Sequence, residues 1–78
     1  MSIVSEIYLY TDDSFSFWLC DYGQTKGILK RKSLTNPDDV WRIPVEVLTK
    51  NRKHLELDKV WKSFFKAIDE AEKLLLLM

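Results

Sequence analysis

The first half of the chain has the residue pattern of two short β-strands joined by a turn. Residues 3–10 and 15–20 are rich in β-branched and aromatic side chains, and Thr11-Asp12-Asp13-Ser14 lies between them. The two runs are typical of strands, and the polar residues between them favour a turn, so we expect a β-hairpin. A loop of two residues at Asp12 and Asp13 would pair the aromatic residues on one side of the sheet, Tyr10 with Phe15 and Tyr8 with Phe17. A one-residue error in register would exchange the two faces.

Two further strands are expected after both glycines, which mark a looser turn at residues 21–27. Residues 28–34 are compatible with a third strand, whose central Lys30-Arg31-Lys32 favours a solvated or edge position because buried charges are costly. From Val40 to Leu48, apolar residues alternate with polar ones, which favours a fourth strand. The alternative is that Pro44 opens a short helix, since proline suits the first helical turn.

The last third of the chain has the periodicity of an amphipathic helix. Its apolar residues recur at intervals of four and three, namely Leu57, Trp61, Phe64, Ile68, Ala71, Leu75 and Met78. This spacing places them on one face of a helix. The sequence therefore predicts an α+β fold: a small antiparallel β-sheet of three to four strands, followed by one long C-terminal amphipathic α-helix packed on one face.

Length and composition favour a single domain over residues 1–78 that is only marginally stable alone. The chain is 46% hydrophobic and has one cysteine and one histidine. A domain of this size buries a limited core, and neither a disulfide nor a metal site is expected to reinforce it. We therefore expect dimerisation to add to the stability of the domain. The N-terminal residues lack the pattern of a secretory signal and no apolar run is long enough to span a membrane, so a cytoplasmic location is expected.

Residues with catalytic potential are few. Cys20 and His54 are the only thiol and imidazole, and neither lies in a recognised local motif. The doublets Asp12-Asp13 and Asp38-Asp39 fall in turns, where aspartate is common for conformational reasons. We therefore expect no enzymatic activity, no cofactor, no metal site and no small-molecule substrate.

An excess of apolar residues at the C-terminus is the main indication of function. The predicted interface comprises Phe65, Leu74, Leu76, Leu77 and Met78. These residues exceed what one sheet face can cover, and exposed apolar patches usually mark interfaces. The competing interpretation is a fraying chain end. The leading hypothesis is a small non-catalytic binding or regulatory module that acts through protein–protein contacts and self-associates as a homodimer through its C-terminal helix.

An uneven distribution of charge supports an alternative function. The chain has no net charge, but residues 25–54 carry eight basic and three acidic side chains, whereas residues 1–24 carry four acidic and no basic ones. Basic side chains beside aromatic strands are typical of sheets that bind single-stranded DNA or RNA. The residues predicted for this role are Lys26, Lys30, Arg31 and Lys32 of the basic segment 26–32, together with Arg42. The competing interpretation is that these lysines only protect a sheet edge.

Overall fold

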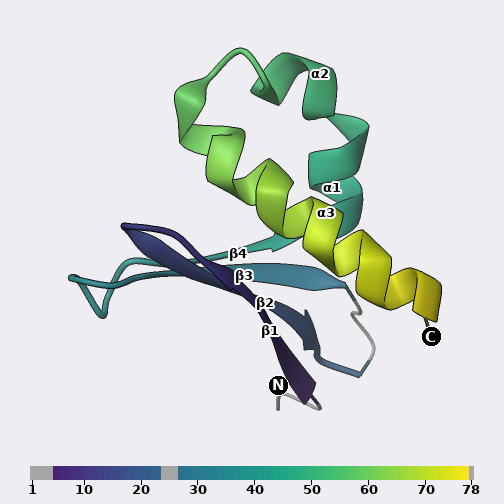
Figure 1. The fold of residues 1–78 in the computed structure, drawn as a ribbon, viewed down its shortest axis with the longest axis horizontal. Coiled ribbons are helices and arrows are strands. Elements are labelled where there is room, and N and C mark those ends of the chain that lie inside the picture. The colour runs from purple at the N-terminus through teal and green to yellow at the C-terminus, as the bar shows by residue number, and fades with distance from the viewer. Residues whose placement is uncertain (1–4, 24–26, 78) are drawn as a thin grey trace.

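The computed structural model describes residues 5–23 and 27–77, without the side chains of Leu75 and Leu77. Four antiparallel strands, in the order β1-β2-β3-β4, form one sheet, and the helices all lie on one of its faces (Figure 1). The strands are β1 (Ser5–Thr11), β2 (Phe15–Asp21), β3 (Ile28–Ser33) and β4 (Val40–Pro44). The helical segments are α1 (Val45–Lys50), α2 (Arg52–Leu55), η1 (Lys59–Trp61) and α3 (Lys62–Leu77). This arrangement confirms the predicted fold class.

The hairpin between β1 and β2 has a different register from the one expected. Thr11 pairs with Ser16, Tyr10 with Phe17 and Tyr8 with Trp18, and a bulge interrupts the pairing between Tyr8 and Tyr10. The loop is longer than two residues because Asp12 accepts hydrogen bonds from the backbone N–H groups of Ser14 and Phe15. The bulge lets Leu9 and Tyr10 both pack against the core. Tyr8 and Phe17 therefore lie on opposite faces, and their expected pairing is wrong.

Two expectations for the next strands also need correction. β3 lies between β2 and β4, so the edge position suggested by its lysines is wrong; the edges are β1 and β4. The fourth strand is confirmed for Val40–Pro44, but it is shorter than expected: α1 begins at Val45, with Pro44 as its N-cap, so the helical alternative holds for the second half of the segment. Val45 and Leu48 are both buried in the core, which an α-helix achieves through their spacing of three residues.

The C-terminal helix begins later than its apolar periodicity suggested. Asp58 caps η1 by accepting a hydrogen bond from the Val60 N–H at 3.0 Å, and α3 follows from Lys62. Phe64, on the sheet-facing side of α3, is fully buried and packs edge-on against Phe17 of β2, with ring centroids 5.3 Å apart. Within the described ranges, no helix has the length and apolar character needed to cross a lipid bilayer.

Candidate functional site

The sheet separates the basic residues that the sequence grouped together. Arg31 points to the helical layer, because its cross-strand neighbours are Phe17 and Trp41 of the core side. Lys30, Lys32 and Arg42 lie on the opposite face, which carries no helix. Lys26 lies outside the described residues. The predicted basic cluster is therefore divided between two faces, as strand alternation requires.

Arg31 is a structural residue and is only 5% exposed. Its guanidinium lies between the rings of Phe15 and Trp41, at 3.9 and 4.0 Å from their centroids, and donates a hydrogen bond to Asp39 at 3.0 Å. Its Nε has no hydrogen-bond acceptor among the described residues. Because Arg31 is buried and paired with Asp39, the structure does not support its predicted role in a nucleic-acid site.

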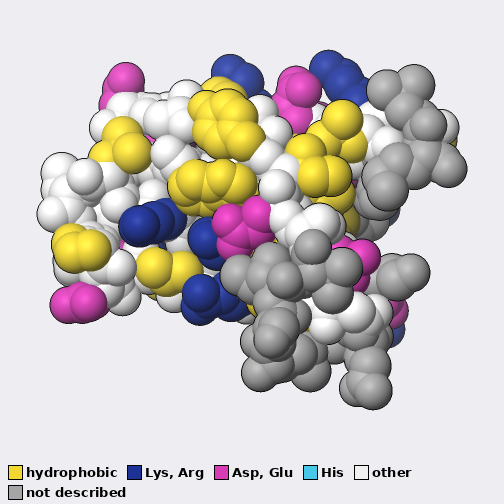
Figure 2. All heavy atoms as spheres, turned by 90° about the horizontal axis from the view of Figure 1, so that it is seen from below, with side chains coloured by type: hydrophobic (Ala, Val, Ile, Leu, Met, Phe, Trp, Pro, Cys, Tyr) yellow, Lys and Arg dark blue, Asp and Glu magenta, His cyan; other side chains and the backbone are white. Residues whose placement is uncertain are grey.

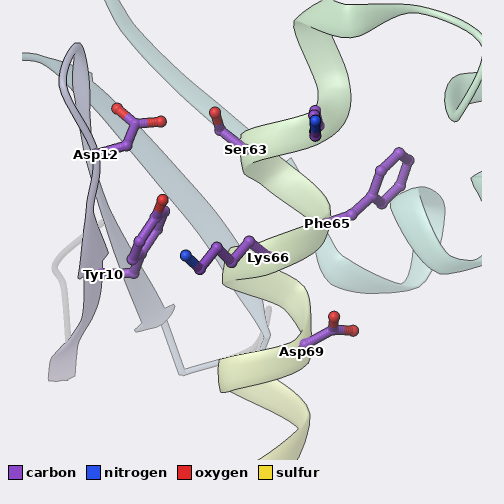
Figure 3. A pocket seen from close by; sticks show the side chains of 7 residues that line it. Tyr10, Asp12, Ser63, Phe65, Lys66 and Asp69 are labelled. Atoms are coloured by element: carbon purple, nitrogen blue, oxygen red, sulfur yellow. The ribbon is translucent and has the colours of Figure 1, made fainter.

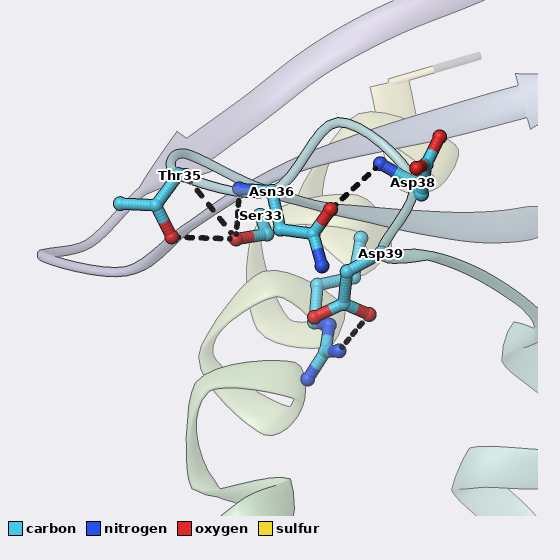
Figure 4. Close-up of polar contacts among 6 residues, drawn as sticks. Ser33, Thr35, Asn36, Asp38 and Asp39 are labelled. Atoms are coloured by element: carbon cyan, nitrogen blue, oxygen red, sulfur yellow. Dashed lines mark hydrogen bonds and ion pairs between the residues drawn. The ribbon is translucent and has the colours of Figure 1, made fainter.

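Asp39 belongs to a turn that side chains hold in shape (Figure 4). Ser33 Oγ accepts hydrogen bonds from the backbone N–H groups of Thr35 and Asn36, and Asn36 Oδ1 accepts one from Asp38 N–H at 3.1 Å. These contacts place Asp39 against Arg31. In the described part of the chain, no group of three or more side chains that could hold a metal ion occurs.

The helix-free face of the sheet carries one row of side chains that crosses all four strands. Tyr8 of β1 pairs with Trp18 of β2, Trp18 with Lys30 of β3, and Lys30 with Arg42 of β4. We call these four residues the open-face row. Figure 2 shows this face, with hydrophobic side chains near its centre and basic and acidic side chains beside them. The row brings aromatic and cationic groups together from segments far apart in sequence.

Short contacts hold the open-face row in place. Lys30 Nζ lies 2.8 Å from Glu6 Oε2 and 4.9 Å from the centroid of the Trp18 ring. The Tyr8 and Trp18 rings meet edge to face with centroids 6.1 Å apart. Arg42 Nε donates a hydrogen bond to the Tyr22 hydroxyl at 3.1 Å. The face is thus a preorganised surface with both rings and cations.

Cys20 and His54 do not form a catalytic pair. Cys20 lies on the helix-free face beside Glu6 and Ile28, whereas His54 lies in α2, so the sheet stands between them. Cys20 is 1% exposed. Burial, followed by the nearby charge of Glu6, raises the pKa of the Cys20 thiol. A buried thiol with a raised pKa is a poor nucleophile.

A groove of about 510 Å³ lies between edge strand β1 and α3. Figure 3 shows its side chains, with Tyr10 and Asp12 on β1 and its turn opposite Ser63 and Lys66 on α3. Lys66 Nζ lies 4.7 Å from the Tyr10 ring centroid. Lys62 and Asp69 also line the groove, so two ammonium groups face two carboxylates and neither sign of ligand charge is favoured.

Asp12 stabilises the hairpin loop beside this groove. Partial burial alone would raise the pKa of Asp12, but hydrogen bonds from the Ser63 side chain and from the Ser14 and Phe15 backbone outweigh it and lower that pKa. A lowered pKa means that the ionised form is bound more strongly in the folded state. Asp12 therefore stabilises the folded state fully at pH values above its unfolded pKa of about 3.9. This stabilisation is lost as the pH falls through the lower pKa that Asp12 has in the folded state.

We therefore expect Asp12→Ala to lower the free energy of unfolding by about 1 kcal/mol at neutral pH, because two backbone donors lose their acceptor. The difference from wild type should shrink below pH 4. Urea denaturation at pH 7 and pH 3 measures both effects. Asp13→Ala is the matched control, since Asp13 is exposed in the same turn. An equal loss in the control, or a loss as large at pH 3 as at pH 7, would contradict this role.

The predicted C-terminal interface is only partly exposed. Phe65 is buried, with the Arg52 guanidinium 5.1 Å from its ring centroid, so it belongs to the core and not to a surface patch. Leu74 is half-buried, and Leu76 is 86% exposed. The side chains of Leu77 and Met78 lie outside the described residues. Of the predicted interface residues, only Leu76 and part of Leu74 are exposed on the described surface.

A second apolar surface was not anticipated from the sequence. Trp41 of β4 and Trp61 of η1 have ring centroids 5.8 Å apart, and exposed Val60 is adjacent in η1. Leu57, in the connection before η1, is 88% exposed. We call Trp41, Leu57, Val60 and Trp61 the tryptophan patch. Helical periodicity assigned Trp61 to the core, which its partly buried ring does contact. Its contact with Trp41 of β4 was not predicted from the sequence.

Compared with known proteins, the chain matches no family model, no curated protein and no solved structure. Function is therefore inferred from the residues and their geometry.

Proposed function

We propose that this chain is a non-catalytic binding module that acts through contacts with proteins, including a second copy of itself. The observation that carries this proposal is the exposure of large apolar side chains on the helical layer, above all Leu57 and Leu76. Exposed apolar groups of this size favour association, because burying them removes apolar area from water.

The tryptophan patch is suited to contact with another protein. Tryptophan is enriched among the residues that dominate binding energy, and here two indoles lie side by side at the end of the helical layer. Trp41 also packs against Phe64, with ring centroids 6.0 Å apart, so its ring is held by the core. A rigid aromatic surface loses little conformational entropy on binding.

The C-terminal end of α3 is the proposed self-association surface. Leu74 and Leu76 contribute to it, and the sequence adds Leu77 and Met78. A second copy would cover these side chains and enlarge the small core of a 78-residue domain.

Light scattering over a micromolar to submillimolar series tests self-association. We expect wild type to shift from monomer to dimer as concentration rises, and Leu76→Glu to stay monomeric because a charge would be buried in the interface. Leu34→Glu is the control, since Leu34 is also an exposed leucine but lies in the β3–β4 connection, far in sequence from Leu76. A wild type that remains monomeric throughout would contradict self-association.

The tryptophan patch is tested by affinity capture from nuclease-treated lysate. Val60→Lys, in the patch, is compared with Val47→Lys in α1, because these valines are 52% and 46% exposed. We expect protein partners to be retained by wild type and Val47→Lys but lost by Val60→Lys. Identical capture by all three chains would contradict a role for the patch.

A further inference from the structure

We propose that the helix-free face of the sheet binds single-stranded nucleic acid, with bases stacked on Tyr8 and phosphates held by Lys32 and Arg42. This site is distinct from the protein contacts proposed above, which use the opposite side of the sheet and the end of α3. It also differs from the basic segment identified in the sequence, because Arg31 is absent from it and Tyr8 and Trp18 are part of it.

The β1–β2 half of the face provides the aromatic surface. Tyr8 is 58% exposed, and its hydroxyl forms a hydrogen bond of 2.6 Å with Thr11 Oγ1. The Trp18 ring supports Tyr8 edge to face and is itself partly covered by Lys30. Tyr8 is therefore the exposed ring on which an unpaired base can stack, and such stacking tolerates any base.

The β3–β4 half of the face provides the cations. Lys30 is engaged by Glu6, but neither Lys32 nor Arg42 has an acidic partner within the described residues. Arg42 contacts Tyr22 through Nε, and its two terminal nitrogens make no hydrogen bond to the described residues. Two such cations on one flat surface complement phosphates.

The helix-free face of the sheet is basic although the chain has no net charge. The described charged residues of the four strands on this face are Glu6, Lys30, Lys32 and Arg42, so cations exceed carboxylates. Adjacent strands lie about 4.8 Å apart, so the row from β1 to β4 spans roughly 14 Å, enough for the two or three bases that sheet-based modules hold. Rings on a flat surface reach unpaired bases and not those inside a duplex, which favours a single strand.

Fluorescence anisotropy of the full chain with labelled oligothymidylate and oligouridylate of about twelve nucleotides tests the site. Affinity should fall as salt rises, and Lys32→Gln combined with Arg42→Gln should reduce the slope of log K against log salt by about 1.4, or about 0.7 per lost contact. Lys50→Gln combined with Lys53→Gln removes the same charge from exposed positions in α1 and α2 and should leave the slope nearly unchanged. Equal slopes for both double variants would overturn the assignment.

Tyr8→Ala separates stacking from charge. We expect roughly five- to 150-fold weaker binding at every salt concentration with an unchanged slope, since loss of one stacked base costs about 1–3 kcal/mol. Tyr8→Phe keeps the ring and should bind like wild type, and circular dichroism verifies the fold of each variant. The DNA and RNA probes distinguish the two sources of a single strand. The proposal is overturned if wild type binds both only in the non-specific range of about 10⁻⁴ M at physiological salt, or binds a duplex of the same length equally well.

Discussion

Phe64→Ala is expected to lower the free energy of unfolding by about 3–5 kcal/mol, the cost of removing a fully buried phenylalanine. Phe64 is the residue at which the two layers meet. Its ring lies 5.3 Å from Phe17 of the sheet and 5.1 Å from Trp61, measured between centroids, and it also stacks with Trp41. Alanine would leave a cavity bounded by three aromatic rings, which cannot close without moving α3 from the sheet.

Urea denaturation followed by circular dichroism measures this loss. Because a domain of this size has a small margin of stability, the variant is expected to be partly unfolded even without urea, so its circular dichroism at zero urea is also compared with that of wild type. Leu57→Ala is the control and should change stability by less than about 0.5 kcal/mol, since Leu57 is exposed. A folded Phe64→Ala variant with near wild-type stability would show that the helical layer does not depend on this contact.

Arg31→Ala is expected to lower the free energy of unfolding by about 3 kcal/mol, because it removes two contacts that the Arg31 side chain makes inside the protein. One is the planar guanidinium between Phe15 and Trp41, and the other is the ion pair with Asp39. Alanine would leave the two rings without the group that separates them. β4 and the turn before it should loosen, so hydrogen exchange of β4 amides is the second measurement.

Two further variants separate the stack from the charge. Arg31→Met keeps a long apolar side chain between the rings and removes the buried charge, so it should recover most of the stability lost in Arg31→Ala. Asp39→Ala leaves the guanidinium buried without its acid and should cost about 1–3 kcal/mol. Arg31→Met being as damaging as Arg31→Ala would instead assign the role of Arg31 to its charge.

The clearest successes of sequence reasoning concern the helix and the strands. The spacing of Phe64, Ile68 and Ala71 predicted a helix with one buried face, and all three are buried in α3. The composition of residues 3–10 and 15–20 predicted paired strands, which the structure has at Ser5–Thr11 and Phe15–Asp21. These features depend on periodicity and local propensity, which are properties of neighbouring residues.

The predictions that the structure contradicts, at Pro44 and in the hairpin register, failed because they depend on contacts between distant segments. The alternation around Pro44 is compatible with a strand or a helix, and only burial of Val45 and Leu48 against the core selects the helix. The bulge between Tyr8 and Tyr10 shifts the register of the hairpin, so that Tyr8 pairs with Trp18 and not with Phe17 as expected. A local pattern carries no information about which of two competing registers buries more apolar area.

The sequence by itself determined the α+β class, the four extended segments, the long C-terminal helix and the surplus of basic residues in the middle of the chain. Tertiary structure alone decided which of those basic residues face water. Arg31 sits between Lys30 and Lys32 in sequence, yet it is enclosed by Phe15, Trp41 and Asp39 on the helical side. The physical reason is that a buried cation is stable only where rings and an acid from other segments meet around it, and folding brings those segments together.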